Sequence, residues 1–220
     1  MNERMYLEIL NEANSFGAKV IAVSKTKPVE AIQLFYNKGQ RLFGENKVQE
    51  LCDKAAVLPK DIEWHLIGHL QSNKVKYVAP FVSLIHAVDS EKLLEEINKQ
   101  AIKCNRVIPC LLQIHIAKEE TKFGFSEEEV LDMLSTVSFQ SFSHIEIHGL
   151  MGMATNTDNA QQIEQEFEYL HLLFQKIKAK HFPYNPYFKE LSMGMSSDYR
   201  LALKHGATMI RVGSILFGER

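Results

Sequence analysis

The sequence predicts an α/β protein folded as a single-domain, closed (β/α)8 TIM barrel. Short runs of apolar and β-branched residues alternate with amphipathic helical patterns, and this order produces parallel strands joined by right-handed crossovers. Eight such runs occur, at intervals of about 20 to 40 residues. No linker-like stretch or break in composition divides the 220 residues, so we expect one domain over residues 1–220. An open doubly wound sheet is the competing fold, and it would need fewer strands or a second domain.

The expected elements begin with a helix outside the barrel repeat. A helical pattern at about residues 2–16 lies within an N-terminal extension over residues 1–18, which precedes the first strand. The eight expected strands then follow in chain order at residues 19–25, 41–46, 63–68, 83–88, 108–116, 145–152, 189–194 and 208–213.

The segments between these strands carry signals for helix ends. Gly17, Gly39 and Gly206 each follow a helical pattern just before a strand, where a glycine after the helix is preferred. Pro28 suits the first position of a helix, and Ser126 forms a capping box with a glutamate three residues later. Apolar stripes indicate two further helices, one carrying Leu93, Leu94, Ile97 and Ala101 and the other Ile163, Phe167, Leu170, Phe174 and Ile177.

Composition and charge narrow the class of partner. The chain is 45% hydrophobic and 24% charged, with a formal net charge of −2, and no Lys/Arg stripe indicates nucleic-acid binding. No apolar run approaches the ~20 residues that cross a bilayer, and the N-terminus lacks a signal-peptide pattern. The three cysteines have no metal-like spacing, and a reducing compartment is the default. We therefore expect a cytoplasmic protein without a membrane or nucleic-acid partner.

Two kinds of motif that resemble metal sites have simpler explanations. His65 and His69, and likewise His144 and His148, are four residues apart, but both pairs fall in or just beyond strands, where four residues span about 13 Å. Neither pair can share one ion, so we expect no metal site. Two methionine pairs are interpreted as pocket lining rather than as a copper site, namely Met151 with Met153 and Met193 with Met195.

The stretch IAVSKTKP places two lysines, Lys25 at the end of the first strand and Lys27 just after it, directly before a helix. Cations are disfavoured there by about 0.3–1 kcal/mol each, because the helix dipole is positive at its N-terminus. Active sites of such barrels lie at the C-terminal ends of the strands. A desolvated Lys25 amine near Lys27 and Arg211 would there have a lowered pKa and could form a Schiff base. The alternative is a solvated loop lysine that tolerates the cost.

Two further segments indicate a phosphate site. ELSMGMSSD and IRVGS run through the ends of the seventh and eighth strands, after which barrels frequently bind phosphate. Backbone N–H groups at a helix start, together with serine hydroxyls, suit an anion. In a closed barrel these segments lie next to the end of the first strand, so the lysine and the phosphate site would be adjacent.

Taken together, these motifs resemble those of a known family. From about residue 20 to the C-terminus the chain resembles the YggS family of pyridoxal 5′-phosphate (PLP) homeostasis proteins, also called proline synthase co-transcribed proteins. The motifs that carry the resemblance keep their order: AVSKTKP, FGENKVQE, WHLIGHLQSNK, VDS, KFGF, GLMGMA, LSMGMSSD and IRVGSILFGER. The resemblance implies a barrel like the N-terminal domain of alanine racemase, PLP fold type III, with PLP as its cofactor.

The resemblance also implies roles for individual residues. Lys25 matches the lysine that forms the Schiff base with PLP, and Arg211 matches the arginine that faces the pyridine nitrogen. Lys122 matches a lysine that influences cofactor exchange. The full expected cofactor-binding set is Lys25, Asn46, Met193, Gly194, Ser196, Ser197, Arg211, Gly213 and Ser214, with the serines and Gly213 at the phosphate.

These roles bear on activity. An arginine carries only donors and stays charged, so opposite the pyridine nitrogen it favours the unprotonated ring, which is a poor electron sink. Racemases of this fold add an acid/base group from another domain, and we find no such domain here. We therefore expect a monomeric protein without efficient catalysis, which holds PLP, delivers it to PLP-dependent apo-enzymes and influences amino-acid and keto-acid balance. The alternatives are a low-activity PLP-dependent amino-acid racemase and an aldolase that uses Lys25 without PLP.

Overall fold

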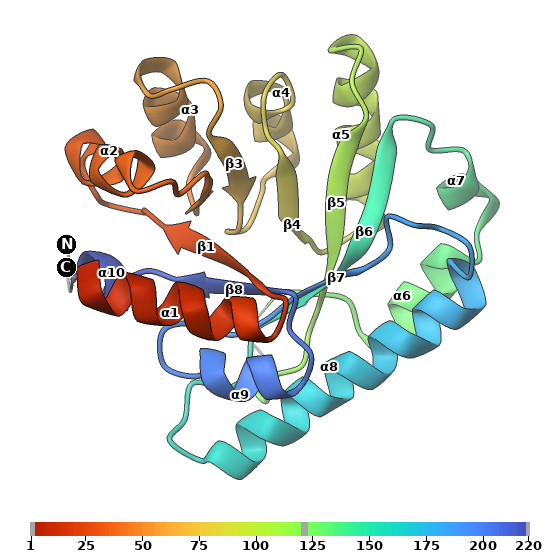
Figure 1. Ribbon diagram of the computed structural model, residues 1–220. Coiled ribbons are helices and arrows are strands. Elements are labelled where there is room, and N and C mark those ends of the chain that lie inside the picture. The colour runs from red at the N-terminus through yellow and green to blue at the C-terminus, as the bar shows by residue number, and fades with distance from the viewer. Residues whose placement is uncertain (1–2, 120–122, 219–220) are drawn as a thin grey trace.

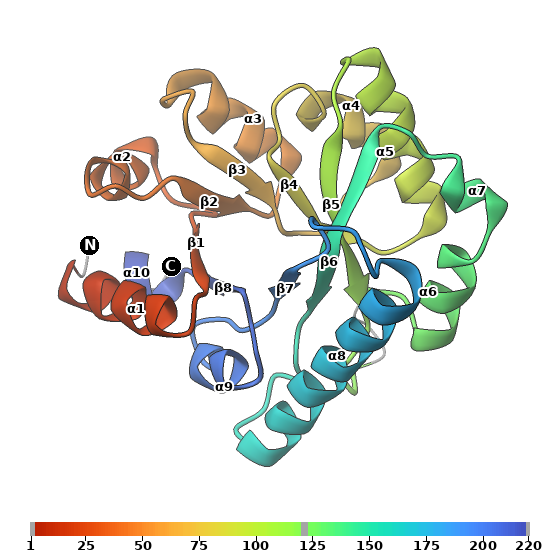
Figure 2. The same cartoon turned by 45° about the vertical axis from the view of Figure 1, so that its right-hand side comes forward.

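The structure confirms the closed barrel. The computed structural model describes residues 3–119 and 123–218. Its eight strands are all parallel and pair in chain order, and β8 closes the barrel against β1 (Figures 1 and 2). The strands are β1 (Lys19–Val23), β2 (Leu42–Glu45), β3 (Glu63–Leu66), β4 (Leu84–Val88), β5 (Ile108–Ile114), β6 (Ile145–Gly152), β7 (Glu190–Ser192) and β8 (Met209–Val212).

Each strand lies within the range predicted for it, and most end one or two residues early. The early ends have a common reason, because the residues at the mouth of the barrel leave the hydrogen-bonded ladder to form turns. The helices are α1 (Glu3–Ser15), α2 (Val29–Asn37), α3 (Val48–Val57), α4 (Val75–Val78), α5 (Glu91–Lys103), α6 (Glu127–Leu134), α7 (Val137–Gln140), α8 (Ala160–His181), α9 (Tyr199–Lys204) and α10 (Ser214–Phe217), with a 3-10 turn at Ser72–Lys74.

The predicted helix ends are confirmed with one small shift. Gly17, Gly39 and Gly206 have φ values of 70°, 95° and 85°, in the left-handed region that favours glycine. Ser126 closes a complete capping box with Glu129 at the start of α6. Pro28 is the residue that precedes α2 and not its first helical residue, because the turn that carries Lys25 extends up to it.

The barrel has two apolar cores, because side chains alternate between the two faces of each strand. The outer core lies between strands and helices and contains Phe43, Trp64 and Phe167, all at most 3% exposed. The inner core is smaller and is formed by Ile21, Leu84, Ala87, Leu111, Met151 and Met209. Polar residues occupy the rest of the interior, which leads to the site described below.

The helix α1 covers part of the barrel wall. It lies beside β1 and α10 in both ribbon views (Figures 1 and 2), and its Tyr6 ring meets Phe35 edge-on with 5.1 Å between ring centroids. Phe35 in turn packs on Phe217 of α10 at 4.5 Å. Because α10 has only four residues, α1 adds apolar cover beside β1 and β8.

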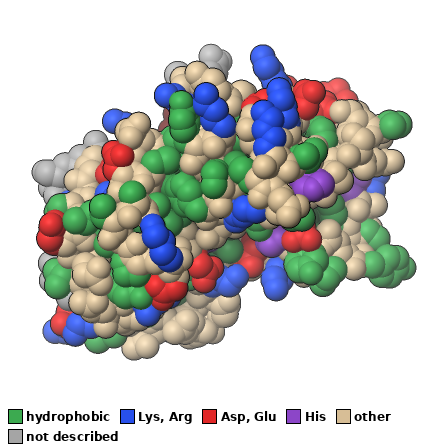
Figure 3. All heavy atoms as spheres, turned by 90° about the horizontal axis from the view of Figure 1, so that it is seen from above, with side chains coloured by type: hydrophobic (Ala, Val, Ile, Leu, Met, Phe, Trp, Pro, Cys, Tyr) green, Lys and Arg blue, Asp and Glu red, His purple; other side chains and the backbone are tan. Residues whose placement is uncertain are grey.

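The surface is mixed in charge. On the face in Figure 3, lysine and arginine side chains are interspersed with acidic, apolar and uncharged ones. Among residues 3–119 and 123–218, we find no helix with both the length and the apolar character needed to span a membrane.

Candidate functional site

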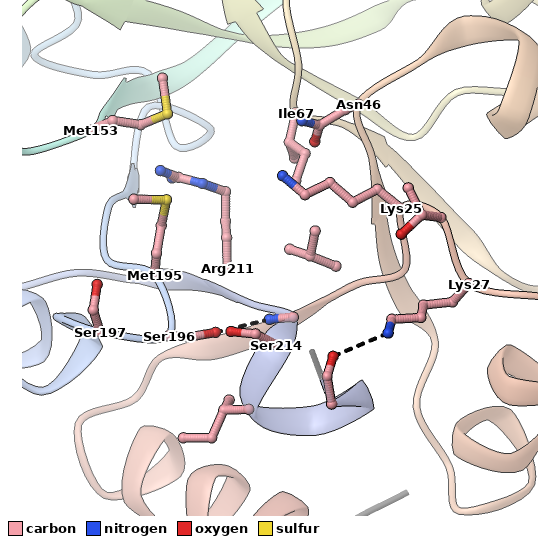
Figure 4. A pocket seen from close by; sticks show the side chains of 15 residues that line it. Lys25, Lys27, Asn46, Ile67, Met153, Met195, Ser196, Ser197, Arg211 and Ser214 are labelled. Carbon is pink, nitrogen blue, oxygen red and sulfur yellow. Dashed lines mark hydrogen bonds between the residues drawn. The ribbon is translucent and has the colours of Figure 1, made fainter. Parts of the chain in front are cut away.

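A cavity of about 670 Å³ opens at the C-terminal ends of the strands. Seven of the nine residues expected at a cofactor site line it together (Figure 4). These are Lys25, Asn46, Ser196, Ser197, Arg211, Gly213 and Ser214. The described lining includes three cationic side chains and no carboxylate, so its electrostatics favour an anionic ligand.

The other two expected residues, Met193 and Gly194, do not line the cavity. Met193 is fully buried in the outer core, because its neighbour Ser192 points into the barrel and successive side chains alternate in direction. Gly194 has φ of 90°, and a Cβ atom there would lie 2.5 Å from Cβ of Ala202. These two residues therefore shape the turn after β7 from the side that faces away from the cavity.

Methionines do line the cavity, at positions that the cofactor set omitted. Met153 and Met195 reach it, together with the apolar Val23, Ile67 and Ile215. The interpretation of the methionine pairs as pocket lining is correct for one member of each pair. Met151 lies in the inner core.

The turn after β1 separates the two lysines of the SKTKP motif. The backbone N–H of Lys27 donates to the Ser24 carbonyl at 3.0 Å, and Thr26 between them has φ of 64°. Lys25 extends into the cavity, toward the side where Arg211 lies, whereas Lys27 turns toward the C-terminal segment (Figure 4). The Nζ atom of Lys27 donates to the Gly218 carbonyl at 3.0 Å.

The segments after β7 and β8 meet at the side of the cavity next to the end of β1, because β8 pairs with β1. Gly213 donates its backbone N–H to Oγ of Ser196 at 3.2 Å, which joins the two turns (Figure 4). The Met195 N–H donates to Asp198 at 2.5 Å and fixes the turn that carries both serines. The N–H groups of Tyr199 and Leu201 at the start of α9 already donate to the Met195 and Asp198 carbonyls, so the hydroxyls of Ser196, Ser197 and Ser214 are the donors that line this corner.

A series of buried polar groups holds the Arg211 guanidinium in place. It is 4% exposed, and its guanidinium donates to Oγ of Ser192 at 2.6 Å and to the Gly152 carbonyl at 3.1 Å. Burial lowers the pKa of Arg211 to about 10, so it stays a cation at neutral pH. Ser192 lies 3.0 Å from Nδ1 of His86, whose Nε2 lies 2.8 Å from Nδ1 of His65.

An arginine can only donate, so Ser192 accepts from Arg211 and still has one proton to give. In the tautomer where that proton goes to Nδ1 of His86, Nε2 of His86 donates to Nδ1 of His65. Burial lowers the pKa of His65 to about 3, and burial, with His65 and Arg211 nearby, lowers the pKa of His86 well below its usual value. Both imidazoles are therefore neutral at physiological pH.

We expect stability to fall as the solution is acidified below pH 6.5, the usual pKa of histidine. A neutral buried histidine binds fewer protons than the same residue in the unfolded chain, so each one lowers the unfolding free energy by up to about 1.4 kcal/mol per pH unit. Urea denaturation between about pH 6.5 and 4.5 should show this slope. His65→Gln, which removes one such group, should give a shallower slope, and an equal slope would contradict the assignment.

Lys122, which the resemblance connects with cofactor exchange, lies outside the described residues.

Among the residues described, no group of three or more potential ligands is arranged to hold a metal ion. His65 and His69 do not pair with each other, since His65 contacts His86 and His69 contacts Asp89 at 2.9 Å.

Comparison with known proteins gives consistent relationships. The model of the alanine racemase N-terminal domain matches residues 5–220. A pyridoxal phosphate homeostasis protein of Aquifex aeolicus is 39% identical over 204 residues, which cover 92% of this chain and 87% of that protein. One of Schizosaccharomyces pombe is 36% identical over 218 residues, covering 97% and 89%.

Solved structures agree with this relationship. PipY of Synechococcus elongatus PCC7942, solved without PLP, has a TM-score of 0.91 and 34% identity, covering 98% of this chain and 99% of PipY. Its structure with PLP bound has a TM-score of 0.83 and 37% identity, covering 92% and 93%. Alanine racemase of Bartonella henselae shares the fold at a TM-score of 0.71 with 16% identity, and this chain matches 59% of its length. The chain therefore belongs to the alanine racemase N-terminal domain family and, within it, to the pyridoxal phosphate homeostasis proteins.

Proposed function

We propose that the chain binds PLP through a Schiff base on Lys25 and acts in intracellular PLP homeostasis, storing the cofactor and delivering it to PLP-dependent apo-enzymes. The observation that carries this proposal is one cavity where an amine, serine hydroxyls and a buried guanidinium meet without a carboxylate in the described lining. The homeostasis proteins of Aquifex aeolicus and Schizosaccharomyces pombe and the PLP-bound PipY structure support it.

The donor set fits PLP on its aldehyde side. When bound, PLP supplies an aldehyde carbon that forms a C=N bond with a primary amine, releasing one water, and hydrolysis reverses the bond. Lys25 supplies that amine from the turn after β1. Asn46, at the end of β2, lines the same wall of the cavity and would orient the ring with its side-chain amide.

The donor set also fits the phosphate and the ring nitrogen. The phosphate would lie in the corner between the turns after β7 and β8, where the Ser196 hydroxyl already contacts the Gly213 N–H, with Ser197 and Ser214 beside it. Arg211 would donate to the pyridine nitrogen, and its charge would keep that nitrogen unprotonated. Met193 and Gly194 are left out of this contact set, since both lie behind the cavity.

We propose further that efficient catalysis is absent. Two of the Arg211 contacts go to Ser192 and Gly152, which hold the guanidinium in place, and an unprotonated ring is a poor electron sink. The relatives are named as homeostasis proteins rather than enzymes, while the racemase likeness supports the fold alone. A low-activity amino-acid racemase is the alternative function, since it needs the same Lys25 and the same fold.

The proposal includes the organisation of the protein. We propose one PLP-binding domain over residues 1–220, with 1–18 as an N-terminal extension, and a monomeric form in the cytoplasm. All three cysteines are free, which suits a reducing compartment. The partners would be PLP and PLP-dependent apo-enzymes, whose active-site lysines would take the aldehyde by the same exchange of a C=N bond.

Two assays on the PLP-loaded protein test the function. Mixed with the apo form of a PLP-dependent enzyme, it should restore that enzyme's activity while losing its own visible absorbance. With common amino acids, racemisation should stay far below the ordinary enzymatic range of about 1–10³ per second. Turnover within that range would establish the racemase instead. A colourless protein that retains no PLP but is trapped by a keto-substrate under borohydride would establish the aldolase.

A further inference from the structure

A buried lysine outside the cavity contacts the turn that carries Lys25. The side chain of Lys54, on α3, is 7% exposed. Its Nζ atom donates three hydrogen bonds of 2.7 Å each, to the Ser24 carbonyl, to Oε1 of Glu45 and to Oε1 of Glu50. These three bonds use every donor of the ammonium group.

The two carboxylates extend this contact to both sides of Lys25. Oε1 of Glu45 also accepts from the Ser24 hydroxyl at 2.6 Å, on the N-terminal side. Oε1 of Glu50 also accepts the backbone N–H of Thr26 at 2.5 Å, on the C-terminal side. We call Glu45, Glu50 and Lys54 the clamp. Its residues come from the end of β2 and from α3, so the clamp fixes the turn relative to the neighbouring βα unit.

The turn needs such support for a backbone reason. Thr26 has φ of 64°, and a β-branched residue in the left-handed region costs free energy that the surrounding contacts must offset. Thr26 itself is exposed, so packing of its side chain does not hold this conformation. Two hydrogen bonds from the clamp support this conformation. The Thr26 N–H donates to Glu50, and Lys54 donates to the Ser24 carbonyl.

We propose that Glu45, Glu50 and Lys54 are positioning residues that hold the Ser24–Lys27 turn so that the Lys25 amine is aimed into the cavity before a ligand arrives. The proposal deepens the function above, because it rests on Lys25 being the PLP lysine. The benefit is preorganisation, since a turn already in its binding geometry loses less conformational entropy when PLP binds.

Glu50 offers a sharp test, because two substitutions separate the effect of its side-chain length from the effect of its charge. Glu50→Gln keeps the length and an accepting oxygen but removes the charge. Glu50→Asp keeps the charge but shortens the side chain by one methylene, so it cannot reach Thr26 and Lys54 together. Both leave Lys54 paired with Glu45, so the fold should persist. Asp53→Ala, an exposed acid on the same helix, is the matched control.

Two measurements apply to each variant. Amide hydrogen exchange of the peptide containing Thr26, measured without PLP, should be faster in Glu50→Asp by about tenfold, as expected for the loss of one hydrogen bond. The PLP affinity of Glu50→Asp should fall about tenfold, while Glu50→Gln and Asp53→Ala stay close to wild type. The melting temperature of the apo-protein is measured alongside. If the melting temperature changes while Thr26 exchange and PLP affinity do not, Glu50 has a merely structural role.

The outcomes separate this proposal from the function on which it rests. If Glu50→Gln loses as much protection and affinity as Glu50→Asp, the role is electrostatic and positioning is wrong. If Glu50→Asp behaves as wild type in both measurements, positioning is also wrong. If the wild-type protein binds no PLP at Lys25, the proposed function fails, and the exchange of Thr26 still reports whether Glu50 holds the turn.

Discussion

Lys25→Ala is expected to abolish covalent capture of PLP completely while leaving the fold intact. Lys25 reaches into the cavity from an irregular turn outside β1, so its removal exposes no apolar core. Without the amine no C=N bond can form with the aldehyde. The measurement is borohydride reduction of the PLP-treated protein, followed by mass spectrometry of the peptides, with circular dichroism to confirm the fold.

Lys27→Ala is the matched control for this experiment. Lys27 lies two residues away and also lines the cavity, but its amine contacts the Gly218 carbonyl at 3.0 Å. This variant should keep full capture at Lys25. Full capture by Lys25→Ala, with the label on Lys27, would contradict the assignment and make Lys27 the anchor.

Lys54→Met is expected to give the largest loss of stability, about 3–5 kcal/mol, because removing one partner of a buried ion pair leaves the other charge uncompensated. Glu45 is fully buried, and its Oε2 atom makes no hydrogen bond within the described residues. Glu50 is close by, so the two carboxylates would face each other without a cation. Urea denaturation measures the loss. Lys92→Met, at an exposed lysine of α5, should change stability by less than about 0.5 kcal/mol.

The loss caused by Lys54→Met should grow as the pH rises. Burial already raises the pKa of Glu45 above 4.5, and the hydrogen bond and charge of Lys54 oppose that rise. Without Lys54 the pKa of Glu45 goes up further, so above pH 4.5 the folded state binds more protons than the unfolded chain and stability falls with increasing pH. The difference from wild type should therefore be larger at about pH 8 than at about pH 5. A difference independent of pH would contradict this account of the clamp.

Part of the site could be predicted because some of its residues lie within a few positions of an apolar run that predicts a strand. Lys25 follows an apolar run directly, and Ser196 and Ser197 follow the next-to-last one, so the barrel topology alone places these three at one rim. The resemblance to the YggS family added the roles of Asn46 and Arg211 in binding PLP. The same reasoning placed Met193 and Gly194 at the cavity, because a motif does not reveal which of two neighbouring residues points inward.

Other parts of the site gave no local signal. Ser192 and His86 contact each other across the barrel although they are 106 positions apart in the chain, and neither belongs to a recognisable motif. Lys54 reads as one more charged residue on an amphipathic helix, yet it is buried against Glu45 and the Lys25 turn. Only the closed arrangement of strands brings such groups within hydrogen-bonding distance.

The amino-acid sequence by itself determined the eight βα units, the order of the strands and the rim at which the chemistry gathers. These follow from hydrophobic periodicity, helix-ending glycines and strand count, all of which act over short stretches of chain. The tertiary structure alone decided which methionines face the cavity, how Arg211 is held by Ser192 and the Gly152 carbonyl, and which buried charges support the Lys25 turn. Side-chain direction and pairing between distant strands depend on register and barrel closure, and those are properties of the folded chain as a whole.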